Sequence, residues 1–165
     1  MVGTSFVEYN GHGFWTRDAA LETVLGLLVE QLQPLSGRDE RLGPVLDYWA
    51  RQAAAGFAGC VSPDLDESLP SPILRSMVVA ALRDILAALP ASGLAEAGGP
   101  EFRQRAGRVC AGAPWRSPSA LVAWVSEVAS ALIDLLEGNL PATAGSWFID
   151  GEGRHHLPGS EASPR

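Results

Sequence analysis

Apolar residues recur at intervals of three and four along the first third of the chain, which is the spacing of one face of an α-helix. We expect one helix to begin at Thr16 or Asp18 as its cap and to run to about Gln33, because Pro34 stops it. A second helix is expected over residues 39–55, with Gly56 as its stop. The two apolar stripes are Leu21, Val24, Leu25, Leu28 and Leu32, and then Leu42, Val45, Leu46, Trp49 and Ala53.

Two further helices carry a Ser-Pro start signal, in which serine accepts free amide hydrogens and proline needs none. Ser71-Pro72 opens a helix to Leu89, and Ser117-Pro118 opens a helix to Glu137 that is stopped by Gly138. Both are apolar over more than half of their circumference, so we expect them to form the buried centre. A short helix over residues 101–110 is expected between them.

Both ends of the chain lack helical periodicity. Residues 6–15 are rich in aromatics and glycine and indicate a short strand or an extended arm. The cluster Trp147-Phe148-Ile149 either pairs as a strand with Phe6-Val7 or packs on the helices. We predict a mainly α fold, a single compact bundle of four to five helices with short extended N- and C-terminal segments. Residues 1–150 would form one globular domain, and residues 151–165, rich in Gly, Pro, Ser and charge, a flexible tail.

Length and composition support a folded domain that needs neither a disulfide nor a metal. The chain has 165 residues, 47% of them hydrophobic, which is enough for a core of its own. Cys60 and Cys110 have no metal-ligand spacing, so we expect two buried thiols, no metal and no cofactor. No apolar run approaches the roughly 20 residues of a membrane helix, and the N-terminus lacks the pattern of a signal peptide. These patterns predict a cytoplasmic protein without membrane contact.

Charge narrows the class of partner. The formal net charge is −7, and every basic residue is arginine, which excludes Schiff-base chemistry and lysine-anchored phosphate loops. An acidic protein repels phosphate backbones, so nucleic-acid binding is disfavoured and a basic protein partner is favoured.

The acidic residues Asp64, Asp66 and Glu67 lie together between two prolines. They lack the further ligands and the glycine of a calcium loop. They form either a solvated acidic loop or a docking surface for a basic partner, which Asp39 and Glu40 could extend.

Two glycines flank His12 in the segment Tyr9–Asp18, and aromatic residues adjoin it. The segment is either a binding loop or an Asn-Gly turn whose aromatics cover the core. In the first case His12 would contact the partner, and Phe14 or Trp15 would be a desolvated anchor.

Residues 101–116 carry a local net charge of +3 in an otherwise acidic chain. Arg105 and Arg108 are three residues apart and would share a helix face. They either clamp a carboxylate or phosphate, or pair with acids of the bundle.

No complete catalytic, metal-binding or phosphate-binding pattern is present, which favours a protein that acts by binding. We expect a non-enzymatic module, a small acidic inhibitor or immunity-type protein that masks a basic toxin or nuclease. One alternative is a small enzyme that uses His12 with a carboxylate or Cys60, although no activating group adjoins Cys60 in the sequence. The other is a structural homo-oligomer, for instance a homodimer that buries the excess apolar helix surface.

Overall fold

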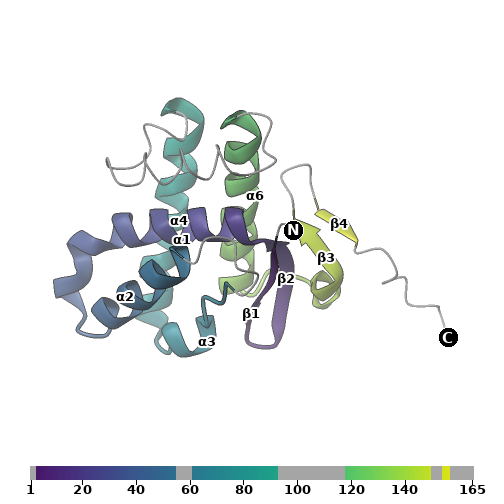
Figure 1. Ribbon diagram of the computed structural model, residues 1–165. Coiled ribbons are helices and arrows are strands. Elements are labelled where there is room, and N and C mark those ends of the chain that lie inside the picture. The colour runs from purple at the N-terminus through teal and green to yellow at the C-terminus, as the bar shows by residue number, and fades with distance from the viewer. Residues whose placement is uncertain (1–2, 55–60, 93–117, 150–153, 157–165) are drawn as a thin grey trace.

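The computed structural model describes residues 3–54, 61–92, 118–149 and 154–156 (Figure 1). The chain begins with a β-hairpin of β1 (Thr4–Tyr9) and β2 (His12–Arg17). Asn10 and Gly11 connect the strands and both have positive φ, 51° and 73°. This is the conformation that a two-residue hairpin loop requires and that Asn-Gly adopts readily. Asn10 and Gly11 therefore form the tight turn of the hairpin.

The hairpin leads directly into the helices. They are α1 (Asp18–Leu32), α2 (Leu42–Ala53), the single turn α3 (Leu65–Ser68), α4 (Pro72–Ser92) and α6 (Pro118–Leu136), with a 3₁₀ segment η1 (Gln33–Arg38) after α1. The predicted starts at Pro72 and Pro118 are confirmed, and Ser71 Oγ accepts the Leu74 amide at 3.2 Å. Gly138 follows α6 with a φ of 75°, as expected of a helix stop. The helix expected over residues 101–110 lies outside the described residues.

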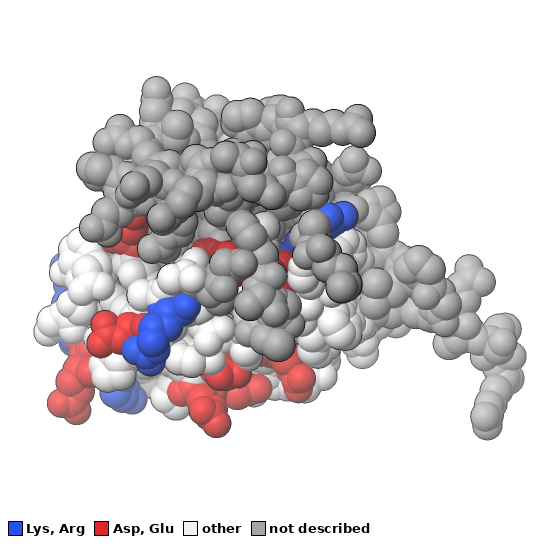
Figure 2. Space-filling model, in the orientation of Figure 1, with Lys and Arg blue, Asp and Glu red and all other residues white. Residues whose placement is uncertain are grey.

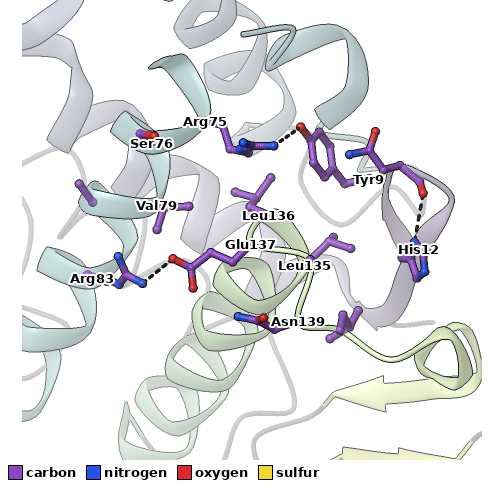
Figure 3. Close-up of a pocket in the computed structure, with 14 residues that line it drawn as sticks. Tyr9, His12, Arg75, Ser76, Val79, Arg83, Leu135, Leu136, Glu137 and Asn139 are labelled. Atoms are coloured by element: carbon purple, nitrogen blue, oxygen red, sulfur yellow. Dashed lines mark hydrogen bonds and ion pairs between the residues drawn. The ribbon is translucent and has the colours of Figure 1, made fainter. Parts of the chain in front are cut away.

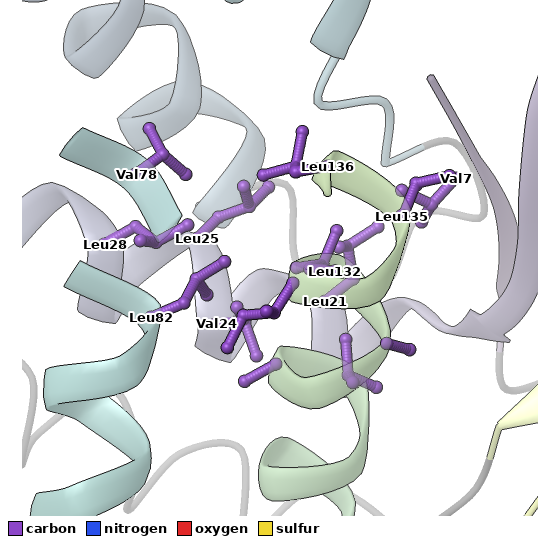
Figure 4. Close-up of a cluster of buried hydrophobic side chains, with 14 of the residues drawn as sticks. Val7, Leu21, Val24, Leu25, Leu28, Val78, Leu82, Leu132, Leu135 and Leu136 are labelled. Carbon is purple, nitrogen blue, oxygen red and sulfur yellow. The ribbon is translucent and has the colours of Figure 1, made fainter. Parts of the chain in front are cut away.

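The core lies where α1, α4 and α6 meet beside the hairpin. Figure 4 shows Leu25 and Leu28 of α1 facing Val78 and Leu82 of α4, with Leu132 of α6 beside them. All five side chains are at most 3% exposed. Every residue of α1 from position 18 to position 28 is buried. The buried centre therefore includes α1 as well as α4 and α6, the two helices that were expected to form it.

A small sheet adjoins these helices. After a 3₁₀ segment η2 (Ala142–Ser146) come β3 (Trp147–Ile149) and β4 (Arg154–His156), and the strand order is β1-β2-β3-β4. β3 pairs parallel with β2, through Trp15 opposite Phe148 and Thr16 opposite Ile149, rather than with the Phe6-Val7 strand.

Two side chains hold β3 in this position. The carbonyl oxygen of Ile149 accepts hydrogen bonds from Thr16 Oγ1 at 3.1 Å and from Trp124 Nε1 at 2.9 Å. Both donors are buried, and a hydroxyl or indole nitrogen in the interior needs such an acceptor. Hydrogen bonding of these two buried side chains thus places β3 on β2.

The expected mainly helical character is confirmed. The expected single compact bundle is not confirmed, because the helices share the core with a four-stranded sheet. Residues 154–156 fall in the stretch expected to be a flexible tail, but they form a strand antiparallel to β3. None of the helices in the described part of the chain combines the length and the apolar character needed to cross a bilayer.

Candidate functional site

Three predicted acidic residues converge with a fourth around one groove. Asp64, Asp66 and Glu67, at the start of α3, line a groove of about 330 Å³ together with Glu8 of β1. We call it the acidic groove; its remaining walls are Phe6, Ser62, Pro63 and Leu65. Figure 2 shows acidic side chains along the lower edge of the molecule, where Figure 1 places α3 and the hairpin.

The segment before α3 is fixed to α2 by buried hydrogen bonds. Pro63 has no amide hydrogen, but its carbonyl oxygen accepts from Trp49 Nε1 at 2.8 Å and from Ser68 Oγ at 3.0 Å. Asp64 then adopts the left-handed conformation, with a φ of 43°, which aspartate tolerates better than most residues. The wall of the groove at Pro63 is therefore tied to both α2 and α3.

Tyr48 connects α2 to the groove. Its hydroxyl donates to the Asp64 carboxylate and lies 2.9 Å from the Ser62 carbonyl oxygen. Ser62 Oγ donates to the other Asp64 oxygen at 2.5 Å. Burial of the ring, and then the hydrogen bond to Asp64, raise the pKa of Tyr48 to about 12. Both oxygens of Asp64 are thus engaged by neutral donors that leave its negative charge intact.

The other three carboxylates of the groove have fewer hydrogen-bond partners than Asp64 among the described residues. Asp66 accepts the Asn10 backbone N–H at 3.0 Å and so ties the hairpin turn to α3. Glu8 and Glu67 are exposed and form no hydrogen bond or ion pair with another described residue. The ion pairs within the described ranges are Arg41–Asp39 and Arg83–Glu137, and neither involves the groove. Four carboxylates therefore gather without a cationic partner among the described residues.

An aromatic surface adjoins these carboxylates. The Phe6 ring lies over Gly13 of the paired strand, where a Cβ atom would be 2.6 Å from Phe6 Cζ. Phe6 also contacts Trp15, its register partner, with ring centroids 5.2 Å apart. Phe6 and Trp15 are each only partly buried. Aromatic faces beside carboxylates suit a guanidinium group, which stacks on the ring while its N–H groups meet the acids.

Several predicted site residues lie elsewhere. Phe14, predicted as one of two possible desolvated anchors for a partner, has a fully buried side chain, because it lies on the inner face of the hairpin beside Val7. The half-buried Trp15 is on the opposite, outer face. His12 is exposed at the hairpin tip and does not line the acidic groove.

Asp39 and Glu40 precede α2 and do not line the acidic groove either. The Asp39 carboxylate accepts from the backbone N–H, Nε and Nη2 of Arg41 at 2.9, 3.0 and 2.8 Å. These side-chain and backbone hydrogen bonds lower the pKa of Asp39. Because Arg41 already neutralises it, Asp39 adds little negative field toward a partner, whereas Glu40 is exposed.

Sequence reasoning missed the side of the groove that β1 supplies, Phe6 and Glu8. The signal was present in the alternation along β1, where Ser5, Val7 and Tyr9 are buried and Thr4, Phe6 and Glu8 face outward. Treating the segment as an undivided arm left these faces unassigned.

The remaining candidates lie outside the described residues. They are Arg105, Arg108, Cys60 and Cys110, so neither the anion clamp nor a pairing of His12 with Cys60 can be placed. Among described residues, His12 contacts the Asn10 carbonyl through Nδ1 at 3.1 Å rather than a carboxylate. No group of three or more His, Cys, Asp or Glu in the described ranges is arranged to hold a metal ion.

A second concavity lies on the other side of the hairpin turn. It measures about 660 Å³ and is enclosed by the hairpin tip, the outer side of α4 and the end of α6 (Figure 3). His12 lines it, together with arginines from α4.

Comparison of the chain with protein-family models, with curated proteins and with solved structures finds no significant match.

Proposed function

We propose that this chain is a cytoplasmic, non-enzymatic protein-binding module whose acidic groove captures a basic partner. An inhibitor or immunity-type protein that masks a basic toxin or nuclease is the role that suits it best. The observation that carries the proposal is the grouping of Glu8, Asp64, Asp66 and Glu67 around one groove with no arginine paired to them among the described residues.

Binding would follow from charge and preorganisation. Asp64 and Asp66 are already held by Tyr48, Ser62 and the Asn10 amide, so ordering them costs little on association. Glu8 and Glu67 are exposed and supply charge that is unpaired among the described residues. An arginine of the partner would stack on Phe6 and donate to these carboxylates, and the negative field would accelerate encounter and fix orientation.

The test uses affinity capture from a lysate of the source cells with three tagged forms of the full chain. One is the wild type, and one carries Glu8→Lys with Glu67→Lys. These two acids are chosen because neither makes a hydrogen bond or ion pair within the described residues, so the fold should tolerate their reversal. The matched control carries Asp47→Lys with Asp84→Lys, two exposed acids outside the groove and an identical change of net charge.

We expect the wild type and the control to retain the same basic protein in near-stoichiometric amount, and the groove variant to lose it. Raising the salt concentration should weaken the complex, because exposed charges are screened. Equal retention by both variants, or equal loss from both, contradicts the proposal. Equal retention would show that the charges of Glu8 and Glu67 do not contribute to binding. Equal loss would show that binding depends on the overall charge of the chain rather than on the groove.

A second candidate function, self-association through α4, rests on a different observation. Ile73 is 65% exposed, and Pro72, Met77 and Ala80 continue an open apolar surface beside it. A contiguous apolar patch on a helix favours contact with another protein surface. If a homodimer uses it, sedimentation equilibrium will give a dimer mass for the wild type and a monomer mass for Ile73→Asp. A concentration-independent monomer mass for the wild type contradicts this candidate.

A further inference from the structure

The larger concavity has an apolar floor and a polar rim. We call it the α4–α6 hollow. The floor consists of Val79 of α4, Leu135 and Leu136 at the end of α6, and Leu140 in the segment that follows α6, each at most 6% exposed. In Figure 3, Arg75 and Tyr9 lie on one side of these leucines, Arg83 and Glu137 on another, and His12 on a third. The volume of about 660 Å³ is within the range of small-molecule sites.

Charge on the rim is unbalanced. Arg83 Nη2 lies 2.5 Å from Glu137 Oε1, so these two charges compensate each other. Arg75 is half-buried and pairs with no carboxylate among the described residues. Its Nη1 is 3.5 Å from the Tyr9 hydroxyl oxygen, which is a weak and neutral contact. Within the described part of the chain, the rim of the hollow therefore keeps one guanidinium available for an anion, although the net charge of the chain is −7.

Further hydrogen-bonding groups face the same space from the hairpin tip and the end of α6. Asn10 and Asn139 both line the hollow. The Nδ1 atom of His12 lies 3.1 Å from the Asn10 carbonyl oxygen, and a carbonyl can only accept, so Nδ1 carries the hydrogen. Nε2 is then left as an acceptor, which would take a hydroxyl or N–H donor of a ligand rather than a carboxylate. The two asparagine amides can donate to the polar end of a small molecule.

We propose that the α4–α6 hollow binds a small organic acid. Its carboxylate would take the two parallel N–H groups of Arg75, whose planar fork matches a carboxylate, and its apolar body would cover Leu135, Leu136 and Val79. One available guanidinium suits a monoanion better than a phosphate dianion, for which the rim offers no second free cation among the described residues. This proposal is independent of the acidic groove, because no residue lines both concavities.

The test is a titration of the full-length protein with sodium benzoate, followed by heteronuclear NMR. Benzamide serves as the neutral probe of the same shape and inorganic phosphate as the dianion. The variant Arg75→Gln removes the proposed anchor, and Arg38→Gln is the matched control, an exposed arginine in η1 outside the hollow. Arg75→Lys keeps the charge without the fork and replaces Arg75→Gln if that variant does not fold.

We expect benzoate to bind with a dissociation constant of about 1–10 mM, as befits a fragment of nine heavy atoms. Its shift changes should be confined to residues that line the hollow. Arg75→Gln should weaken binding by at least about 10-fold, Arg75→Lys by about 3-fold or more, and Arg38→Gln by less than about 2-fold. Benzoate binding that is unaffected by either Arg75 variant overturns the proposal. Equal affinity for benzamide, tighter binding of phosphate, or no binding of benzoate up to about 50 mM does so too.

Discussion

Replacement of Gly13 by alanine tests how the hairpin supports the aromatic wall of the acidic groove. A Cβ at this position would lie 2.3 Å from the Val7 carbonyl oxygen and 2.6 and 2.9 Å from Phe6 Cζ and Cε1. Ordinary van der Waals contacts of a methyl group begin near 3.4 Å, so both neighbours must move by several tenths of an ångström or more. The ring can turn aside, but the carbonyl belongs to the backbone of β1.

The magnitude follows from these two contacts. Overpacking that requires backbone movement costs about 1–3 kcal/mol. Loss of chain entropy in the unfolded state on replacing glycine by alanine offsets about 0.4–1 kcal/mol of this. Because the closest neighbour is a backbone atom, we expect Gly13→Ala to lower the free energy of unfolding by about 1–2.5 kcal/mol.

Urea denaturation monitored by circular dichroism measures this difference. Gly43→Ala in α2 is the control: a Cβ there has no neighbour within 4 Å, so alanine should be neutral or should stabilise by up to about 1 kcal/mol. In a protein that already carries Phe6→Ala, Gly13→Ala should still lower the free energy of unfolding, but by less than it does in the wild type. The clash with Phe6 is then absent, whereas the clash with the Val7 carbonyl oxygen persists. A Gly13→Ala protein within about 0.3 kcal/mol of the wild type would refute the described packing of Phe6 on the hairpin.

Three further predictions test contacts around the groove and the sheet. Asp66→Ala should speed hydrogen exchange of the Asn10 amide and lower the free energy of unfolding by about 0.5–1 kcal/mol, because this amide loses its acceptor. The control Glu67→Ala should change neither the exchange rate nor the free energy of unfolding. An unchanged exchange rate of the Asn10 amide in Asp66→Ala would contradict the hydrogen bond. The pKa of Tyr48 is raised from 10.0 to about 12, so its stabilising contribution is complete below pH 10 and is lost as the pH rises toward 12. Subtracting the phenolate absorbance of Tyr48→Phe from that of the wild type isolates the titration of Tyr48, whose midpoint should lie near pH 12. A midpoint near pH 10 would contradict the raised pKa. Thr16→Val should lower the free energy of unfolding in urea by about 0.5–1.5 kcal/mol and speed hydrogen exchange in β3, because the Ile149 carbonyl oxygen then keeps only the Trp124 donor. Hydrogen exchange in β3 at the wild-type rate would show that Thr16 does not hold this strand.

Much of the helical fold could be predicted from local signals. The starts at Pro72 and Pro118 and the stop at Gly138 follow from capping chemistry, which acts within a few residues and is visible in the sequence. The burial of Trp49 also agrees with the apolar stripe on which it lies. The sheet was harder to foresee. The pairing of β3 with β2 depends on hydrogen bonds to Ile149 O from Thr16, 133 residues away in sequence, and from Trp124.

The candidate site shows the same division. Asp64, Asp66 and Glu67 could be recognised because they are adjacent in the sequence. The contributions of Glu8 and Phe6 required the hairpin register, which also decides that Trp15 faces outward and Phe14 inward. A shift of one residue in a strand reverses every side chain, so composition alone could not distinguish the anchor from the core. Neutralisation of Asp39 by Arg41 likewise depends on side-chain geometry.

Hydrogen exchange of this chain with and without its captured basic partner tests the central claim most directly. If the acidic groove is the contact surface, binding will slow exchange in residues 6–8 and 62–67 and leave the exposed side of α4 around Ile73 unchanged. The same experiment at high salt should show weaker protection, since exposed charges are screened. Protection confined to α4 or to the α4–α6 hollow, with residues 6–8 and 62–67 exchanging as in the free protein, would contradict the account.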